Sequence, residues 1–169
     1  MQILIFVLIL VLIIFMEVST MAKTEFQKKL KLKNLTPFSY DFFDIIINIE
    51  SSYNQFAYNV FSGAKGLMQL TEIACRDVNR NYESLYESDY NVDTGLLYFQ
   101  KLYYDYNSIT KNDIKKVVCA YNMGIGNLNN LINIYGEEYI LHLPGETKNY
   151  IEKFEKLMLE KGKNWNNII

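Results

Sequence analysis

The chain has 169 residues, of which 50% are hydrophobic and 21% charged, and 17 basic against 19 acidic side chains give a formal net charge of −2. This composition argues against a nucleic-acid-binding protein, which would need a clustered excess of Lys and Arg, and against a disordered chain, which would lack so much apolar surface. One histidine and two cysteines offer too few ligands for a zinc site. We therefore expect one folded domain of ordinary size, with no metal and no cofactor.

The hydrophobic residues are concentrated at the N-terminus, where residues 3–16 are all apolar. As a helix this run would reach about 21 Å, which is short for a bilayer core of about 30 Å and typical of the apolar region of a signal peptide. No Lys or Arg precedes it, whereas Lys23, Lys28 and Lys29 follow closely. We interpret residues 1–22 as a signal peptide or a retained membrane anchor of an exported protein. The alternative is a cytoplasmic chain.

The rest of the chain divides into a lysine-rich linker at 23–36, one domain at 37–160 and a C-terminal tail at 161–169. Within the domain, apolar residues recur at three-to-four spacing, which predicts amphipathic helices. No segment alternates apolar and polar residues as a strand does, so the predicted fold class is all-α. The predicted helices cover about 39–50, 67–78, 91–106, 113–123 and 127–135, and a last one begins near 147.

Glu50 ends the first of these helices and is followed directly by Ser51. A carboxylate at a helix C-terminus lies at the negative end of the helix dipole, and here it also adjoins an apolar stripe. Both effects favour the neutral form and raise the pKa. A carboxyl group with a raised pKa still holds a proton near neutral pH, as a general acid must. Taken alone, Glu50 is better explained as a solvated residue that ends a helix.

Glu50 is also the start of a series of five sequence elements along the domain. They are Glu50-Ser51, GAKGLMQL at 63–70, the pair Asn91 and Gly95, AYNMG at 120–124, and ETKNY at 146–150. In this order and spacing the chain resembles the catalytic domain of the lytic transglycosylases related to goose-type lysozyme. The resemblance covers about residues 42–158. Each element is weak alone, but the five together are specific.

The resemblance implies a mainly helical, lysozyme-like fold with a glycan-binding groove. It implies that the substrate is the glycan strand of peptidoglycan, cleaved in the periplasm or cell envelope at the β-1,4 bond from N-acetylmuramic acid to N-acetylglucosamine. Glu50 matches the family's single catalytic acid and base, which protonates the glycosidic oxygen and then deprotonates the 6-hydroxyl of muramic acid, so that a 1,6-anhydro ring closes. We expect a monomer without nucleic acid, and membrane contact through residues 3–16 if the leader is retained.

Candidate substrate-binding residues also follow from the resemblance. Gln69 and Asn122 carry amides suited to acetamido and hydroxyl groups. The hydroxyl of Tyr150 matches one that approaches the catalytic glutamate. For Met68, Tyr98 and Tyr121, core packing is an equally good explanation. The full candidate set is Ser51, Met68, Gln69, Tyr98, Tyr121, Asn122, Glu146 and Tyr150.

Several alternatives stay open. The loop after Glu50 is one residue longer than the common spacing and has Asn59 where many members have serine, with Ser62 as a substitute. This altered loop leaves room for a glycan-binding component with vestigial activity. A lysozyme-like hydrolase that uses water is a further alternative, and it would need a second carboxylate near the groove. Cys75 and Cys119 form either a disulfide or two buried thiols.

Overall fold

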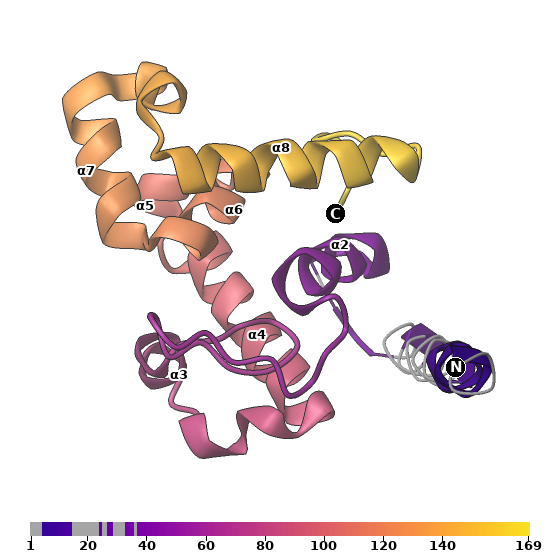
Figure 1. Ribbon diagram of the computed structural model, residues 1–169. Helices are drawn as coiled ribbons and strands as arrows, with labels where there is room; N and C mark the ends of the chain where they lie inside the picture. The colour runs from indigo at the N-terminus through magenta and orange to yellow at the C-terminus, as the bar shows by residue number, and fades with distance from the viewer. Residues whose placement is uncertain (1–4, 15–23, 25–26, 29–32, 36) are drawn as a thin grey trace. The chain divides into compact units, whose positions relative to one another are not determined.

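The computed structural model describes residues 5–14, 24, 27, 28, 33–35 and 37–169, in two units that divide after Leu35 (Figure 1). In the first unit, residues 5–14 are helical and their side chains are exposed. None of the helices in the described part of the chain is long and apolar enough to cross a membrane. The end of the predicted leader and much of the predicted linker lie outside the described residues, so both stay predictions.

The second unit is built from helices joined by short connections, with one longer loop between residues 52 and 71. In that loop Lys65 forms isolated antiparallel bridges with Tyr58 and Leu70, and the described residues contain no strand. The prediction of an all-α domain is therefore confirmed. In chain order the elements are α2 (Tyr40–Ser51), α3 (Glu72–Asp77), η1 (Tyr82–Tyr86), α4 (Ser88–Tyr104), α5 (Asn107–Thr110), α6 (Ile114–Met123), α7 (Ile125–Tyr135), η2 (Gly136–His142) and α8 (Gly145–Glu160).

The second predicted helix is where the structure differs most from the sequence pattern. Helix α3 is limited to Glu72–Asp77, because Gln69 has a φ of +46°, a left-handed conformation that a right-handed helix does not contain. Thr71 then opens α3, and its Oγ1 accepts a hydrogen bond of 3.2 Å from the N–H of Ala74. The apolar residues that produced the helical pattern are instead buried as loop residues: Leu67, Met68 and Leu70.

Two helices that carry site residues begin at side-chain caps. The Oγ of Ser39 accepts a hydrogen bond of 3.2 Å from the N–H of Phe42 at the start of α2. The Oδ1 of Asp113 accepts hydrogen bonds of 2.8 and 3.2 Å from the N–H groups of Lys115 and Lys116 at the start of α6. Such caps satisfy backbone donors that have no partner within the helix, which explains why both helices begin where the sequence predicts.

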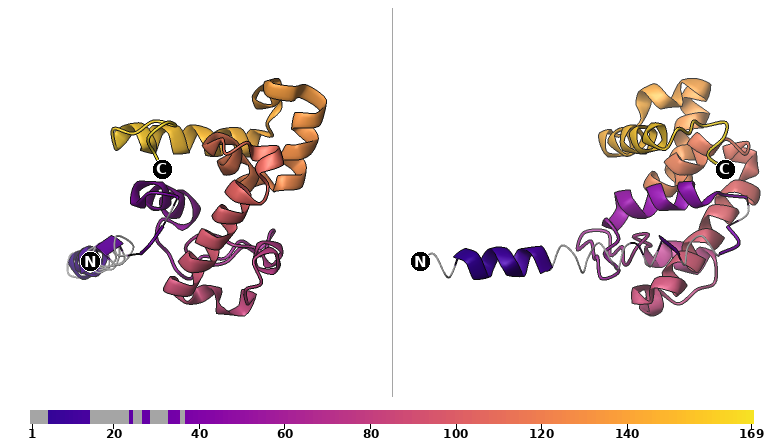
Figure 2. Two further views of the ribbon diagram at one scale, coloured as in Figure 1. Left: turned by 180° about the vertical axis from the view of Figure 1, so that it is seen from behind. Right: turned by 90° about the vertical axis from the view of Figure 1, so that its right-hand side faces the viewer.

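Phenylalanines from three helices form the core around α2. Phe42 is fully buried, and its ring meets Phe99 of α4 edge-on at a centroid distance of 5.0 Å and Phe154 of α8 at 5.5 Å. Figures 1 and 2 show the consequence: α2 lies between α8 on one side and the region of α3 and α4 on the other. The C-terminal end of α2, which carries Glu50, is thus held between two parts of the domain.

Candidate active site

A cleft of about 410 Å³ opens beside the C-terminal end of α2. Its walls come from the loop after α2 and from helices α3, α4, α6 and α8, so segments far apart in the sequence meet around it. The residues that line it are Glu50, Asn59, Ser62, Ala64, Gln69, Leu70, Thr71, Ile73, Ala74, Tyr98, Tyr121, Asn122, Met123, Gly124 and Glu146.

Glu50 is the titratable group at the centre of this arrangement. Its Oε1 accepts a hydrogen bond of 2.7 Å from the hydroxyl of Tyr150 in α8. Burial raises the pKa of the Glu50 carboxyl, the hydrogen bond from Tyr150 lowers it, and the charge of Glu146 raises it, which leaves the pKa at about 7. The direction agrees with the sequence argument, and burial is the largest cause. Glu50 can therefore either give or take a proton near neutral pH.

Most of the residues predicted from the sequence meet at the cleft. Besides Glu50, the lining includes Gln69, Tyr98, Tyr121, Asn122 and Glu146. Tyr150 is buried next to them and reaches the cleft through its hydrogen bond to Glu50.

Ser51 and Met68 are not among the lining residues. The hydroxyl of Ser51 donates a hydrogen bond of 2.8 Å to the carbonyl oxygen of Leu67. Met68 is fully buried, and its carbonyl oxygen accepts a hydrogen bond from the hydroxyl of Tyr121. Both residues thus fasten the loop at 63–70 to the helices around it, and their contact with substrate stays a prediction.

The two ends of the Gln69 side-chain amide differ: the N–H groups bond to the loop, and the oxygen is left for the cleft. Its Nε2 donates hydrogen bonds to the carbonyl oxygens of Ala57 at 3.1 Å and Gly66 at 3.0 Å. These bonds stabilise the left-handed conformation of Gln69 and use both N–H groups of the amide. The carbonyl oxygen Oε1 is the part of the side chain left to accept a hydrogen bond from a ligand in the cleft.

Asn91 explains why the pair Asn91 and Gly95 belongs to the motif series. Asn91 is fully buried in α4, where its Oδ1 accepts a hydrogen bond of 2.9 Å from the N–H of Met68 and its Nδ2 donates to the carbonyl oxygens of Leu85 and Lys65 at 2.9 and 3.1 Å. One turn later, a Cβ on Gly95 would lie 2.3 Å from the sulfur of Met68. The pair therefore holds the loop that carries Gln69.

Two tyrosines give the cleft an aromatic wall. The ring of Tyr121 stacks on Phe99 at a centroid distance of 4.2 Å, and Tyr98 lies 5.9 Å from Tyr121. Burial raises the pKa of Tyr98 to about 12 and that of Tyr121 well above its ordinary value. Both phenols are therefore neutral at physiological pH.

The structure adds lining residues that the motifs did not identify. Asn59 and Ser62, noted in the sequence only as departures from the family pattern, both face the cleft. The Oδ1 of Asn59 accepts hydrogen bonds from the N–H groups of Phe61 at 3.0 Å and Ser62 at 3.2 Å, so it shapes the turn itself. Ile73 of α3 also lines the cleft. The sequence pattern does not distinguish it from a core residue, since the predicted helix over 67–78 is longer than α3.

The described residues contain no group of three or more His, Cys, Asp or Glu side chains that could hold a metal ion. Cys75 and Cys119 are both buried and free, so the thiol alternative holds and the disulfide alternative is wrong. Burial raises the pKa of both thiols, that of Cys119 to about 12. Neither cysteine lines the cleft.

A family model described as the transglycosylase SLT domain matches residues 28–143. The structure of an inactive mutant of the lytic transglycosylase Slt from Pseudomonas aeruginosa is similar with a TM-score of 0.57 and 16% sequence identity, over 88% of this chain and 26% of that chain. This chain therefore spans about a quarter of the length of that protein. No curated protein gives a significant match.

The two comparisons agree with the geometry. The solved structure has the same mainly helical fold, and the range matched by the family model contains Glu50 and the four sequence elements up to AYNMG at 120–124. Glu146 and Tyr150 lie beyond that range, and α8 brings Tyr150 to Glu50. Since the match covers more than half of its residues, the chain belongs to the transglycosylase SLT domain family.

Proposed function

We propose that this protein is a peptidoglycan lytic transglycosylase that uses Glu50 as its single general acid and base. The observation that carries the proposal is the hydrogen bond of 2.7 Å between Tyr150 and Glu50 beside a cleft, with the pKa of Glu50 at about 7. Membership of the SLT domain family supports peptidoglycan as the substrate. The bond cleaved is the β-1,4 link from N-acetylmuramic acid to N-acetylglucosamine.

In the first step the protonated Glu50 gives its proton to the glycosidic oxygen, and the bond from that oxygen to C1 of muramic acid breaks. The acetamido oxygen of the substrate stabilises the positive charge that develops at C1, so no nucleophilic carboxylate is required. In the second step the Glu50 carboxylate takes the proton of the 6-hydroxyl, and O6 bonds to C1. The product ends in a 1,6-anhydro ring, Glu50 is protonated again and no water is consumed.

Tyr150 supports both steps. Burial and the charge of Glu50 raise the pKa of Tyr150 well above its ordinary value, so the hydroxyl keeps its proton and donates to Oε1. A hydrogen bond to a carboxylate is stronger than one to a neutral carboxyl group, so it stabilises the anion formed in the first step. It also holds Oε1, which leaves Oε2 to exchange the proton with the substrate.

The other polar groups of the cleft suit the binding of an uncharged glycan. Asn122 is half-buried in α6, and its amide offers two donors and an acceptor to acetamido or hydroxyl groups. The carbonyl oxygen of Gln69 and the phenol of Tyr98 face the same space. We assign these three side chains to substrate binding.

Glu146 supports hydrolysis as a second candidate function. It lies in the first turn of α8, is exposed and lines the cleft with Glu50, so the cleft holds two carboxylates. A glycosidase that uses water employs such a pair, one residue as acid and the other as base or nucleophile. The two functions differ in their product, because hydrolysis leaves a hydrated reducing end.

The substrate also bears on location. Peptidoglycan lies outside the cytoplasmic membrane, so we propose that residues 1–22 direct export to the periplasm or cell envelope and that residues 3–16 contact the membrane if they are retained. We further propose that the exported protein acts as a monomer. Fractionation of cells that express the full chain, with N-terminal sequencing and light scattering of the recovered protein, tests these three points.

The decisive experiment is mass spectrometry of purified peptidoglycan after digestion with the full-length protein. We expect fragments that end in 1,6-anhydromuramic acid, and none from Glu50→Gln, which keeps the shape of the side chain but cannot exchange the proton. If the wild type releases only fragments with hydrated reducing ends, and Glu146→Gln releases none, the function is hydrolysis. Glycan binding without any released fragment would refute both enzymatic functions.

A further inference from the structure

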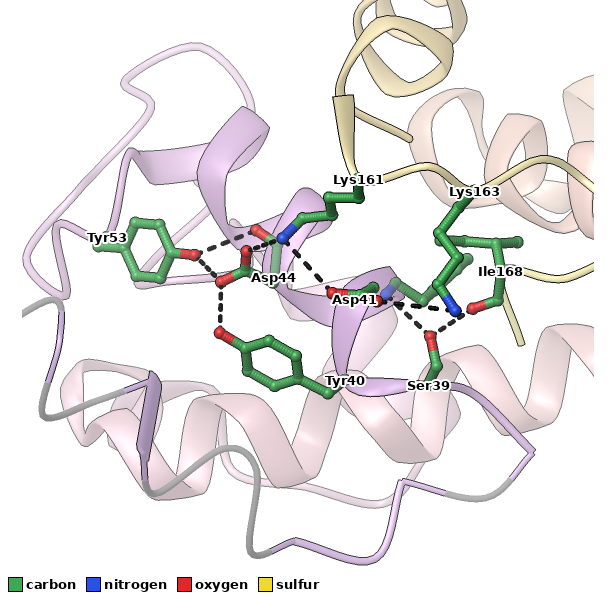
Figure 3. A network of polar contacts seen from close by, with 9 residues as sticks. Ser39, Tyr40, Asp41, Asp44, Tyr53, Lys161, Lys163 and Ile168 are labelled. Atoms are coloured by element: carbon green, nitrogen blue, oxygen red, sulfur yellow. Dashed lines mark hydrogen bonds and ion pairs between the residues drawn. The ribbon is translucent and has the colours of Figure 1, made fainter. Parts of the chain in front are cut away.

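A buried carboxylate outside the cleft connects the elements that carry the Glu50 and Tyr150 pair. Asp44 lies in α2 and is only 7% exposed (Figure 3). Its Oδ2 lies 2.8 Å from the ammonium nitrogen of Lys161, and its Oδ1 accepts hydrogen bonds from the hydroxyls of Tyr40, at 3.1 Å, and Tyr53. Asp44 is not among the residues that line the cleft.

The partners of Asp44 come from both sides of the site. Lys161 follows the last residue of α8, the helix whose first half carries Tyr150. Tyr53 belongs to the loop that leaves α2 directly after Glu50. The bond between Asp44 and Lys161 therefore ties one end of the α2 and α8 pair, and the bond between Tyr150 and Glu50 lies at the other end.

The segment after Glu50 needs such support. Ser52 and Tyr53 have φ values of 50° and 68°, left-handed conformations that are costly for residues with a side chain. The hydroxyl of Tyr53 also lies 3.3 Å from the carbonyl oxygen of Asp44, so one phenol bonds both the side chain and the backbone of the same residue. This contact closes the turn that follows Glu50.

Stability alone is a weak reason for this arrangement. Asp44 is buried but 29% of the Lys161 side chain is exposed, and an ion pair that solvent still reaches adds little net stability. Its directional bonds can instead fix the register of the elements that it joins. Here those elements are α2, the loop after it and the end of α8.

We propose that Asp44 is a positioning residue, which through Tyr53 and Lys161 fixes the distance between Glu50 and the hydroxyl of Tyr150. The proposal rests on the proposed function, since it assigns Asp44 a contribution to that reaction. Without Asp44 the turn after Glu50 loses its side-chain anchor, and Lys161 at the end of α8 loses its 2.8 Å partner and keeps its contact of 3.4 Å with Asp41. The hydrogen bond from Tyr150 to Glu50 then lengthens, while the cleft residues that bind substrate stay in place.

The test is the pKa of Glu50 in Asp44→Asn, measured in the full chain by carbon NMR of the carboxyl group. Tyr150 and Glu146 from α8 act on the pKa of Glu50, and the charge of Glu50 in turn acts on Tyr121 from α6. Loss of the negative charge of Asp44 could by itself only lower the pKa of Glu50, whereas a weakened hydrogen bond from Tyr150 raises it. We expect a rise, and no further rise when Asp44→Asn is added to Tyr150→Phe.

Two hydroxyl deletions form a matched pair that leaves the charges unchanged. Tyr53→Phe removes the bond between the loop and α2, and Tyr40→Phe removes a bond between residues of the same helix, four positions apart. We expect Tyr53→Phe to raise the pKa of Glu50 and lower kcat about tenfold with KM within about twofold, since misplacement by about 1 Å can cost about 100-fold. Tyr40→Phe should change neither quantity.

Two results would overturn the proposal. One is an unchanged or lowered pKa of Glu50 in both Asp44→Asn and Tyr53→Phe, with the fold intact by circular dichroism. The other is an equal response to Tyr53→Phe and Tyr40→Phe. If the wild-type protein releases no fragments from peptidoglycan, the proposed function fails, but the NMR titration still decides whether Asp44 positions the pair. Since Tyr53→Phe is the milder change, it decides the case if Asp44→Asn does not fold.

Discussion

Replacing Glu50 with glutamine should stabilise the folded protein by an amount that grows from about pH 4.5 and is complete above about pH 7. The pKa of Glu50 is about 7 in the folded state against an ordinary value of 4.5. Between these values the folded state binds more protons than the unfolded state, so stability falls as the pH rises through this window. Below pH 4.5 both states are protonated, and the penalty disappears.

The size of the effect follows from the same two values. One pH unit corresponds to about 1.4 kcal/mol, so keeping Glu50 ionised in the folded state costs about 3 kcal/mol above pH 7. Glutamine is neutral at every pH, so the folded variant has no free-energy cost of this kind. The stability gained by Glu50→Gln should therefore be about 3 kcal/mol larger at pH 8 than at pH 4.

The assay is urea unfolding of the wild type and Glu50→Gln at pH 4 and pH 8, followed by circular dichroism. Comparing the two pH values removes any constant effect of the substitution on packing or on the bond to Tyr150. Glu152→Gln, the same substitution at an exposed position on the helix that carries Tyr150, is the matched control. An equal gain at both pH values, or a larger gain at pH 4, would refute the reasoning.

Three further predictions follow from the site. Tyr150→Phe removes a bond that lowers the pKa of Glu50, so the alkaline limb of the kcat profile should move up by about one pH unit; a downward shift would contradict this. Glu146→Gln removes a charge that raises the same pKa, so the limb should move down in the same rate series. Gly66 has a φ of +77°, and a Cβ added there would lie 2.2 Å from Nδ2 of Asn91. Gly66→Ala should therefore lower the free energy of unfolding in urea by about 2–4 kcal/mol, and a loss under about 1 kcal/mol would show that the loop adjusts to the added methyl group.

The helices could be predicted because they depend on local sequence, and the capped starts of α2 and α6 and the apolar stripes indicate them directly. The direction of the pKa shift of Glu50 could be predicted from its place at the end of an apolar helix, but its largest cause, burial, depends on how the other elements pack around the cleft. The segment at 67–71 could not be read in this way. Its apolar residues fit a helical pattern, but the left-handed Gln69 depends on hydrogen bonds to distant backbone atoms.

The contacts of Asn91 could not be predicted from the sequence for a similar reason. Asn91 and Gly95 are identified through their resemblance to a family motif, and the motif does not say what they contact. The amide of Asn91 joins residues 65, 68 and 85, which meet only after the loop and two helices have packed. A motif of this kind identifies the residues of a site but not the contacts that each of them makes.

Several residues beside the cleft have backbone conformations that are costly for their residue type. The side chains that stabilise these conformations lie outside the cleft. Ser52, Tyr53 and Gln69 are all left-handed, at a cost of about 1–2 kcal/mol each. Asn91 holds the loop of Gln69, and Asp44 holds Tyr53. Neither of these buried polar residues lines the cleft, so their replacement should disturb catalysis more than substrate binding. A kcat that falls while KM stays constant distinguishes such supporting residues from Asn122, whose loss should raise KM.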